Sequence, residues 1–304
     1  MTAVSEIISA HLEKIRAFYD AAPVTPQWGA RCYRRLLAHY YNLLIPPEAS
    51  VLEIGCGSGG LLGLLRATRK TGIDLSASQI VAARQHVPGV AFQVQAGESL
   101  ELAATFDYII ISDTLNLAAD VQRLLERMHT VAHPGTRLIV NFQNSLWRPG
   151  LSLARMLGLK SAQPQNSWLA SSDVLNLLRL AGWDPICRQN RVLLPIPCLG
   201  LDRLLNRWLA PLMGWFCLTV FCTARSLRAA PTTPRTVSIV IPARNEAGNI
   251  AAAVLRTPEM GAGTELIFVE GHSRDDTWAQ IQRVQQEHPQ RKIKIMQQTG
   301  INLP

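Results

Sequence analysis

The chain has 304 residues, of which 48% are hydrophobic and 17% are charged, and it carries a formal net charge of +8. This length suggests about two domains, and the apolar content argues against a disordered chain. Six cysteines without any C-x-x-C spacing argue against a disulfide scaffold and a zinc knuckle, so we expect free thiols in a reducing cytoplasm. The N-terminal residues mix charges into an amphipathic pattern, which is not typical of a signal peptide.

In chain order, residues 5–45 are expected to form helices that end at Pro46-Pro47. Strand-like and helix-like segments then alternate, which predicts an α/β fold with a doubly wound, mostly parallel sheet. The predicted strands and helices of this part are strands at 51–55, 71–75, 90–94, 106–112 and 137–142, and helices at 61–69, 79–87, 120–133 and 173–181.

The second half of the chain begins with an extended piece that reaches residues 192–194, and the apolar run 216–224 predicts a further strand. Residues 225–235 contain Arg, Ala, Thr and Pro without periodicity, which is typical of a linker between domains. The alternation then restarts, with strands expected at 236–242, 264–270 and 292–298 and a helix expected after each of the first two.

The positive charge is concentrated in one part of the chain. Residues 179–235 contain eight arginines and only two aspartates, and the stretch is also rich in Leu, Trp and Pro. Basic residues mixed with apolar ones fit an anionic lipid surface at least as well as a nucleic-acid groove. We expect no nucleic-acid partner. For residues 195–216 two interpretations stay open: an insertion packed on its own domain, and a peripheral contact at the inner face of the membrane. A transmembrane helix over residues 208–224, which carry no charge, is a third interpretation.

A glycine-rich turn at VLEIGCGSGG follows the first predicted strand. Such a turn lets ligand atoms approach the backbone closely, and a following helix would offer unpaired N–H groups. Asp74 ends the next strand, 19 residues after Gly55, where an acid could bind two ribose hydroxyls. Gly55, Gly57 and Gly60 fit the dinucleotide spacing, whereas Glu53 favours S-adenosylmethionine, whose amino-acid part is cationic. A turn without any ligand is the third interpretation.

The segments VLEIGCGSGG, GIDLS, FDYIIISDTLN and HPGTRLIV resemble successive motifs of the class I S-adenosylmethionine-dependent methyltransferases, over roughly residues 15–228. The resemblance implies a Rossmann-like seven-stranded sheet with N-terminal helices and an antiparallel last strand at 216–224. It also implies that the turn holds the amino-acid part of the cofactor, that Asp74 binds the ribose and that Leu75 packs on the adenine. The cofactor-binding residues implied in this way are Glu53, Gly55, Cys56, Gly57, Gly59, Asp74, Leu75, Gly97, Glu98 and Ser112.

Methyl transfer from a sulfonium is an in-line displacement, so positioning of the acceptor supplies much of the catalysis. A hydroxyl acceptor would also need a base. Asp113, after the fourth strand, is the residue that we expect to be catalytic, with a loop or capping role as its alternative. Further polar candidates at the predicted mouth are Tyr19, Asn116, Asn141 and Asn144. His129 and His133 are spaced like half of a metal site on the predicted helix 120–133, but no third ligand is evident and no metal is expected.

The segments VSIVIPARNEAGNI and ELIFVEGHSRDDT resemble the start of a family 2 glycosyltransferase with the GT-A fold, over residues 236–300. The resemblance implies a partial sugar-nucleotide site at Pro242, Arg244, Glu246 and Glu270, with Gly271 where a second acid is common. The family's later aspartate pair, which binds a divalent metal, is not reached. We therefore expect an incomplete GT-A-like α/β domain, the front part of a longer fusion, without glycosyl transfer.

These inferences divide the chain into a methyltransferase domain at 1–228, a linker at 229–235 and a partial glycosyltransferase domain at 236–304. The expected function is methyl transfer from S-adenosylmethionine to a small-molecule, sugar or lipid acceptor. Two alternatives stay open. The chain could be a glycosyltransferase fragment whose first domain is an accessory module, or a cofactor-binding scaffold without chemistry.

Overall fold

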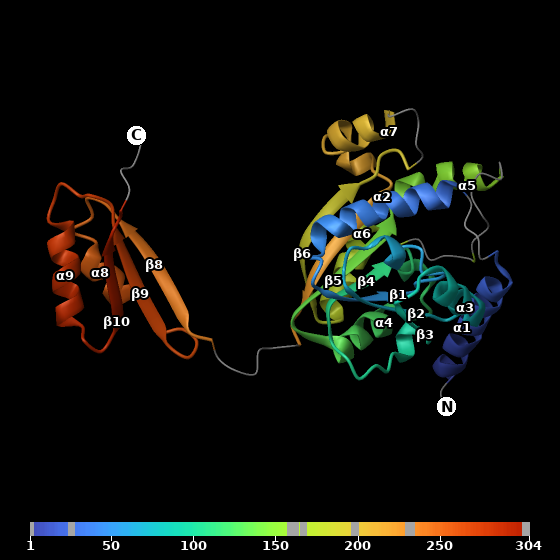
Figure 1. The fold of residues 1–304 in the computed structure, drawn as a ribbon, viewed down its shortest axis with the longest axis horizontal. Coiled ribbons are helices and arrows are strands. Elements are labelled where there is room, and N and C mark those ends of the chain that lie inside the picture. The colour runs from blue at the N-terminus through green and yellow to red at the C-terminus, as the bar shows by residue number, and fades with distance from the viewer. Residues whose placement is uncertain are drawn as a thin grey trace. The chain divides into compact units, whose positions relative to one another are not determined.

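The computed structural model describes most of the chain as two compact units, which are coloured from blue to yellow and from orange to red in Figure 1. Unit 1 is Met1–Ala230 and unit 2 is Pro231–Pro304. The described residues are 3–23, 28–156, 164, 169–195, 201–228 and 235–299. Two predicted segments lie partly outside the described residues: the linker at residues 229–234, and the membrane-contact segment at residues 196–200. The interpretation of the two units as separate domains stays a prediction.

Unit 1 is built on a seven-stranded sheet in the order β3-β2-β1-β4-β5-β7-β6. β7 is antiparallel to both of its neighbours, and the other described strand pairs of this sheet are parallel. The predicted seven-stranded α/β sheet with an antiparallel last strand is therefore confirmed. The strands are β1 Ser50–Ile54, β2 Arg69–Asp74, β3 Ala91–Val94, β4 Phe106–Ser112, β5 Ala132–Gln143, β6 Trp183–Arg191 and β7 Thr219–Ser226.

Helices cover both faces of this sheet, which is why its central strands are apolar without alternation. In β4, Ile109 and Ile111 point into one core and Ile110 points into the other, and none of the three is exposed. The first core also contains α4 and α6, and the second contains α2 and α3. The helices of unit 1 are α1 Ala3–Ala21, α2 Trp28–Leu44, α3 Ala77–His86, α4 Val121–Arg127, α5 Arg148–Met156, α6 Ser171–Leu180 and α7 Leu201–Leu204.

The helix predicted at 61–69 is wrong. The structure has a single 3₁₀ turn at Leu62–Leu64 instead, and β2 already begins at Arg69. Gly63 lowers the helix propensity of this short segment, and the Thr68 N–H donates to the Pro47 carbonyl as the chain returns to the sheet. The glycine turn is therefore not followed by the helix N-terminus that we expected.

The helix predicted at 120–133 is also shorter than expected, because α4 ends at Arg127 and a 3₁₀ turn leads into β5. His133 therefore lies on a strand, and the two histidines have separate partners. His129 bonds to the Ala181 carbonyl at 2.8 Å, and His133 bonds to Asp107 at 3.1 Å. Among the described residues, no group of three or more potential ligands could hold a metal ion.

Unit 2 is a three-stranded parallel sheet in the order β10-β9-β8. Its core joins the sheet to two helices, and alternate residues of β9 are buried. The three predicted strands and the two helices between them are thus present, while the GT-A-like assignment stays a prediction. The elements are β8 Val237–Ala243, α8 Ile250–Arg256, β9 Thr264–Glu270, α9 Thr277–Glu287 and β10 Lys292–Gln297. In the described part of both units, no helix is long and apolar enough to cross a membrane.

Candidate active site

The carboxyl ends of β1, β2, β4 and β5 meet at one edge of the sheet in unit 1, because these strands are parallel. The glycine turn follows β1, Asp74 is the last residue of β2, and Asp113 follows β4. The antiparallel β7 begins at this same edge with Thr219. Residues far apart in sequence are thereby brought to one place.

The glycine turn has the backbone geometry expected of a ligand cradle. Gly55, Gly57 and Gly59 have φ values of +72°, +52° and +74°, which side chains other than glycine rarely adopt. The N–H groups of Gly55 and Cys56 donate to the Ile73 carbonyl at 2.8 and 3.0 Å, so the turn is tied to β2. A Cβ atom at Gly57 would meet nothing closer than 3.9 Å, so this position is open to a ligand.

Asp74 lies beside the turn and has room for further hydrogen bonds. Its two carboxylate oxygens accept from the N–H groups of Gly57 at 2.8 Å and Ser76 at 2.9 Å. Burial raises the pKa of Asp74, and these backbone donors oppose that shift. Each carboxylate oxygen has a second lone pair, so hydroxyl groups of a ligand could still donate to it.

Glu53 is buried beneath the turn, with 3% of its surface exposed, and its Oε2 atom has no hydrogen-bond partner among the described residues. Burial raises the pKa of Glu53 to about 8, and the Arg34 guanidinium opposes that shift. Arg34 extends from α2 to the turn, where its Nη1 atom would lie 2.6 Å from a Cβ atom placed on Gly60. An orphaned buried carboxylate oxygen needs an explanation, and a cationic ligand group would supply one.

Two of the predicted cofactor-binding residues, Gly97 and Glu98, lie after β3, and a third, Leu75, lies after β2. Glu98 is buried, and its Oε1 atom accepts from the Ala119 N–H at 2.9 Å, so it holds the loop that follows β4. Gly97 is packed tightly, since a Cβ atom there would lie 2.4 Å from Leu124. Leu75 follows Asp74 and is half-buried, and Gln95 has a buried Oε1 atom without a partner among the described residues. The roles of Leu75, Gly97 and Glu98 toward the cofactor stay predictions.

A polar network surrounds Asp113 on the other side of the edge. Asp113 follows Ser112, the last residue of β4, and has a φ of +53°, an unusual conformation for a residue with a side chain. Its N–H donates to the Asn141 carbonyl at 3.0 Å, and the Asn141 Nδ2 donates to its carboxylate at 3.1 Å. The Tyr33 hydroxyl lies 2.9 Å from Thr219 Oγ1, and burial followed by the neighbouring Asp113 raises the pKa of Tyr33.

Helix α1 lies over this edge. Burial, and then the charges of Asp74 and Asp113, raise the pKa of Tyr19 to about 12, which places Tyr19 near both carboxylates. The Ser76 hydroxyl donates to Asp20 at 2.5 Å, and His11 bonds to the Leu117 carbonyl at 3.1 Å. The helix is thus anchored at the start of α3 and at the loop after β4.

As expected, the structure brings together Glu53, the glycine turn, Asp74, Ser112, Asp113 and Tyr19. The roles of these residues stay predictions. Sequence reasoning missed Arg34, Tyr33 and Tyr41, which reach the edge from α2. Tyr33 and Tyr41 are spaced by two helical turns with Leu37 between them, which indicates a buried face. Because buried hydroxyl groups need hydrogen-bond partners, the tyrosines on this face were the sequence signal that could have pointed to Tyr33 and Tyr41.

Of the other predicted candidates, Asn116 and Asn144 also lie after strands at this edge. The Oδ1 atom of Asn116 is buried without a partner among the described residues. The Asn144 side chain instead donates to the carbonyls of Trp215 and Cys217, so it holds a neighbouring segment. Cys56 packs in the core beneath the turn, and burial raises the pKa of its thiol.

In unit 2, the predicted sugar-nucleotide residues lie at the carboxyl ends of the neighbouring parallel strands β8 and β9 or in the loop after β8. Glu270 is buried, and the Ser273 N–H at 2.5 Å and the Gln297 side chain at 3.2 Å donate to its two oxygens. These bonds lower the pKa of Glu270. Pro242, Arg244 and Glu246 are exposed, and the Glu246 N–H donates to Thr277 Oγ1 at 2.7 Å.

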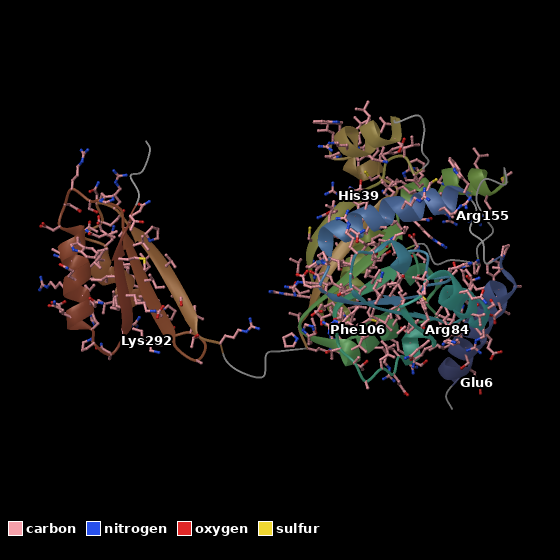
Figure 2. The ribbon with its side chains drawn as sticks, in the orientation of Figure 1. Glu6, His39, Arg84, Phe106, Arg155 and Lys292 are labelled. Atoms are coloured by element: carbon pink, nitrogen blue, oxygen red, sulfur yellow. The ribbon has the colours of Figure 1, made fainter. Side chains whose placement is uncertain are left out.

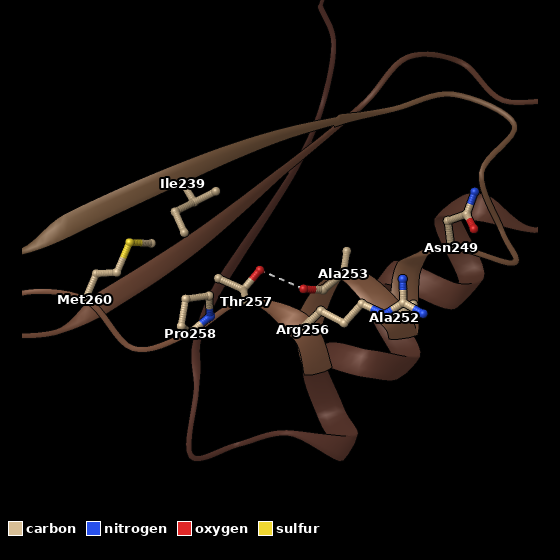
Figure 3. Close-up of a pocket in the computed structure, with 8 residues that line it drawn as sticks. All are labelled: Ile239, Asn249, Ala252, Ala253, Arg256, Thr257, Pro258 and Met260. Atoms are coloured by element: carbon tan, nitrogen blue, oxygen red, sulfur yellow. Dashed lines mark hydrogen bonds between the residues drawn. The ribbon is translucent and has the colours of Figure 1, made fainter.

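A separate shallow pocket of unit 2 lies between β8 and α8 (Figure 3) and has a volume of about 490 Å³. None of the predicted sugar-nucleotide residues lines it. At the end of α8, Thr257 Oγ1 donates to the Ala253 carbonyl at 2.7 Å, and both residues line this pocket. The lining residues are Ile239, Asn249, Ala252, Ala253, Arg256, Thr257, Pro258 and Met260.

Part of unit 1 is similar to known proteins. Residues 45–174 match a family model described as a methyltransferase domain. A ubiquinone biosynthesis O-methyltransferase of Nitrobacter winogradskyi is 29% identical over 125 residues, which are 39% of this chain and 46% of the relative. A trans-aconitate 2-methyltransferase of Acidovorax sp. is 31% identical over 123 residues, which are 38% of this chain and 47% of the relative. The chain thus spans less than half the length of these relatives.

The fold of unit 1 also has a solved counterpart. An S-adenosylmethionine-dependent methyltransferase of Thermotoga maritima superposes with a TM-score of 0.50 and 16% identity, covering 72% of this chain and 99% of the other. At that identity the likeness concerns the fold. Residues 45–174 are thus similar to a methyltransferase domain, and unit 1 has the fold of the solved methyltransferase. Residues 231–304 lie outside the stretch that the family model matches.

Proposed function

We propose that unit 1 transfers a methyl group from S-adenosylmethionine to a hydroxyl group of a small-molecule acceptor. The observation that carries the proposal is the buried Oε2 atom of Glu53, unpartnered among the described residues, beside an open glycine turn. A carboxylate in that position suits a cationic amino-acid group better than a pyrophosphate, which favours this cofactor over a dinucleotide. We assign the remaining residues of this edge to the other parts of the same cofactor.

In this proposal each residue of the edge has a defined part. The turn at Gly55–Gly59 and the Glu53 carboxylate hold the amino-acid group, and Asp74 accepts hydrogen bonds from the ribose. Cys56, Leu75, Gly97, Glu98 and Ser112 contribute the walls of the site. When bound, the cofactor supplies a methyl group on a positively charged sulfur, and its transfer to oxygen leaves a neutral thioether. Tyr19 and α1 would exclude water from this edge.

We assign the action on the acceptor to Asp113. Its carboxylate accepts from the Asn141 amide, and a carboxylate can accept several hydrogen bonds at once. A hydroxyl that approaches the methyl group in line could give its proton to Asp113 as the new C–O bond forms. The name of the relative from Nitrobacter winogradskyi, an O-methyltransferase, supports an oxygen acceptor. A sugar or a lipid with a free hydroxyl would satisfy the same chemistry.

Two other interpretations make different predictions. A cofactor-binding scaffold would bind S-adenosylmethionine without turnover. A glycosyltransferase fragment would transfer sugar from a nucleotide donor in the presence of a divalent metal. Glu270 does not distinguish between these interpretations, because each of its oxygens accepts one hydrogen bond from the protein, as at Asp74, and has a second lone pair. We propose that unit 2 has no glycosyl-transfer activity in this chain, and sugar transfer from a nucleotide donor with a divalent metal would contradict this.

The test is calorimetric titration of the full chain with S-adenosylmethionine and with NAD, followed by assays for S-adenosylhomocysteine in the presence of a cell extract. We expect binding of the first ligand only, and turnover that Asp113→Asn lowers without a change in cofactor affinity. The exposed cap of α4 offers a matched control, Asp120→Asn, which should leave turnover unchanged. Binding without turnover would favour the scaffold, and binding of NAD alone would reject the proposal.

A further inference from the structure

Two segments of unit 1 expose large apolar side chains on one surface, which we call the aromatic patch. It is formed by residues 144–156, which include α5, and by residues 201–217, which include α7. The exposed fractions are 84% for Met156, 79% for Leu212, 67% for Trp208 and 65% for Trp215. Leu146, Leu153, Leu204 and Phe216 also belong to it. Single exposed apolar residues are common on protein surfaces, but a group of large ones on two segments that bond to each other marks an interaction site.

The two segments form one ordered surface. The indole Nε1 of Trp147 donates to the Phe216 carbonyl at 2.7 Å, and the two rings lie 5.3 Å apart. The Asn144 side chain donates to the carbonyls of Trp215 at 2.9 Å and Cys217 at 3.1 Å. Beneath the patch, Cys217 and neighbouring apolar side chains form a small buried cluster. Backbone carbonyl groups of residues 215–217 thus accept hydrogen bonds from within the protein, while the side chains of Trp208 and Trp215 are exposed.

The charges within the patch are almost all positive. Residues 144–156 and 201–217 contain four arginines and one acid, Asp202. The Arg207 guanidinium lies 5.9 Å from the centre of the Trp208 ring, and Arg155 lies near the end of α5 (Figure 2). Tryptophan and arginine beside aliphatic side chains are the residues that proteins place at the boundary between lipid headgroups and acyl chains. A surface of this charge is complementary to anionic headgroups.

The patch borders the candidate active site. β5 ends at Gln143 and β7 begins at Thr219, and the Asn144 N–H between them donates to the Leu218 carbonyl at 2.7 Å. Thr219 in turn bonds to Tyr33, which lies beside Asp113. Both patch segments therefore leave the sheet at the edge that carries the predicted cofactor and acceptor residues.

We propose that the aromatic patch docks unit 1 onto an anionic lipid bilayer, with the active-site edge beside the headgroups. Trp208, Leu212 and Trp215 enter the interface, and Arg155 and Arg207 contact the headgroup phosphates. Docking itself does not depend on methyl transfer. Its consequence for the acceptor, a hydroxyl at headgroup level, does rest on the proposed function.

The experiment is co-sedimentation of the full chain, without cofactor, with vesicles of phosphatidylcholine alone and of phosphatidylcholine mixed with phosphatidylserine. We expect binding to the mixed vesicles only, weakened by added salt and accompanied by a blue shift of tryptophan fluorescence. The double variant Trp208→Ser/Trp215→Ser should bind at least about ten-fold more weakly, since it removes two interfacial anchors. Because binding is measured without cofactor, a failure of methyl transfer would not affect this result.

The matched control is Leu180→Ser/Leu255→Ser, which removes two side chains that are 66% and 68% exposed but lie on α6 and α8. This variant should bind like the wild type. Equal losses in both variants, or no binding of the wild type at low salt, would overturn the proposal. Self-association that the tryptophan substitutions abolish, without vesicle binding, would show that a second copy of the chain covers the patch and would overturn it as well.

Discussion

The Tyr41 hydroxyl donates a 2.6 Å hydrogen bond to Oδ1 of Asn141, and neither residue is exposed to solvent. This bond joins α2 to β5 across 100 positions of the chain. Because Oδ1 is occupied in this way, the Nδ2 of Asn141 faces Asp113 and donates to its carboxylate. A helix outside the sheet thus determines how the amide beside the expected catalytic residue is oriented.

Tyr41→Phe should therefore lower the free energy of unfolding by about 1–3 kcal/mol, because it leaves a buried acceptor unsatisfied. Denaturant unfolding measures the change. Tyr108→Phe is the control, since the described part of the chain shows no hydrogen bond of that hydroxyl, and its effect should stay within about 0.5 kcal/mol. Equal effects of the two substitutions would contradict the importance of the bond to Asn141.

Gly55→Ala should cost more stability than Gly89→Ala, although both glycines have positive φ values, of +72° and +83°. The backbone term is about 1–2 kcal/mol at either position. At Gly55 the new Cβ would also lie 2.5 Å from the Thr114 side chain, whereas at Gly89 it would meet nothing within 4 Å. Thermal and denaturant unfolding should show a difference of at least about 1 kcal/mol, and cofactor binding should fall only in Gly55→Ala.

Asp74→Ala should weaken S-adenosylmethionine binding by about ten-fold or more, since hydrogen bonds to a charged group contribute about 1.5–3 kcal/mol. Calorimetry of the full chain measures the affinity. The control is Asp107→Ala, because Asp107 also accepts from a backbone N–H, that of Ser50 at 2.8 Å, but lies at the opposite end of β4. Loss of affinity in both variants would point to a general effect on folding.

The raised pKa of Glu53, about 8, predicts two pH dependences with opposite signs. An unfolded Glu ionises near pH 4.3, so between about pH 4.3 and 8 the folded state binds more protons, and stability falls as the pH rises through this window. A bound cation favours the ionised carboxylate, so cofactor affinity should instead rise from about pH 6 to 8 and binding should release protons.

Titrations in two buffers with different ionisation enthalpies measure that proton release. Glu53→Gln should remove both the release and the pH dependence of affinity, whatever its effect on affinity itself. A wild-type affinity that does not change between these pH values would show that Glu53 does not contact the cationic group of the ligand.

The strands of unit 1 could be predicted because their signals are local. The buried run at 106–112 and the glycines after 51–55 specify a central parallel strand and a ligand turn at its end. The helix at 61–69 could not be predicted correctly, since its apolar residues fit a helix but the return of the chain to β2 leaves room for one turn. Periodicity over so few residues does not distinguish these outcomes.

The sequence by itself determined the class of fold, the edge of the sheet that carries the site and the acids and glycines that line it. The tertiary structure alone decided their partners. Tyr33 meets Thr219 across 186 positions, and the charges of Asp74 and Asp113 act on Tyr19 because α1 is anchored to Ser76 and Leu117. Such contacts depend on how helices pack across a sheet, and residue patterns record which face of a helix is buried but not what it is buried against.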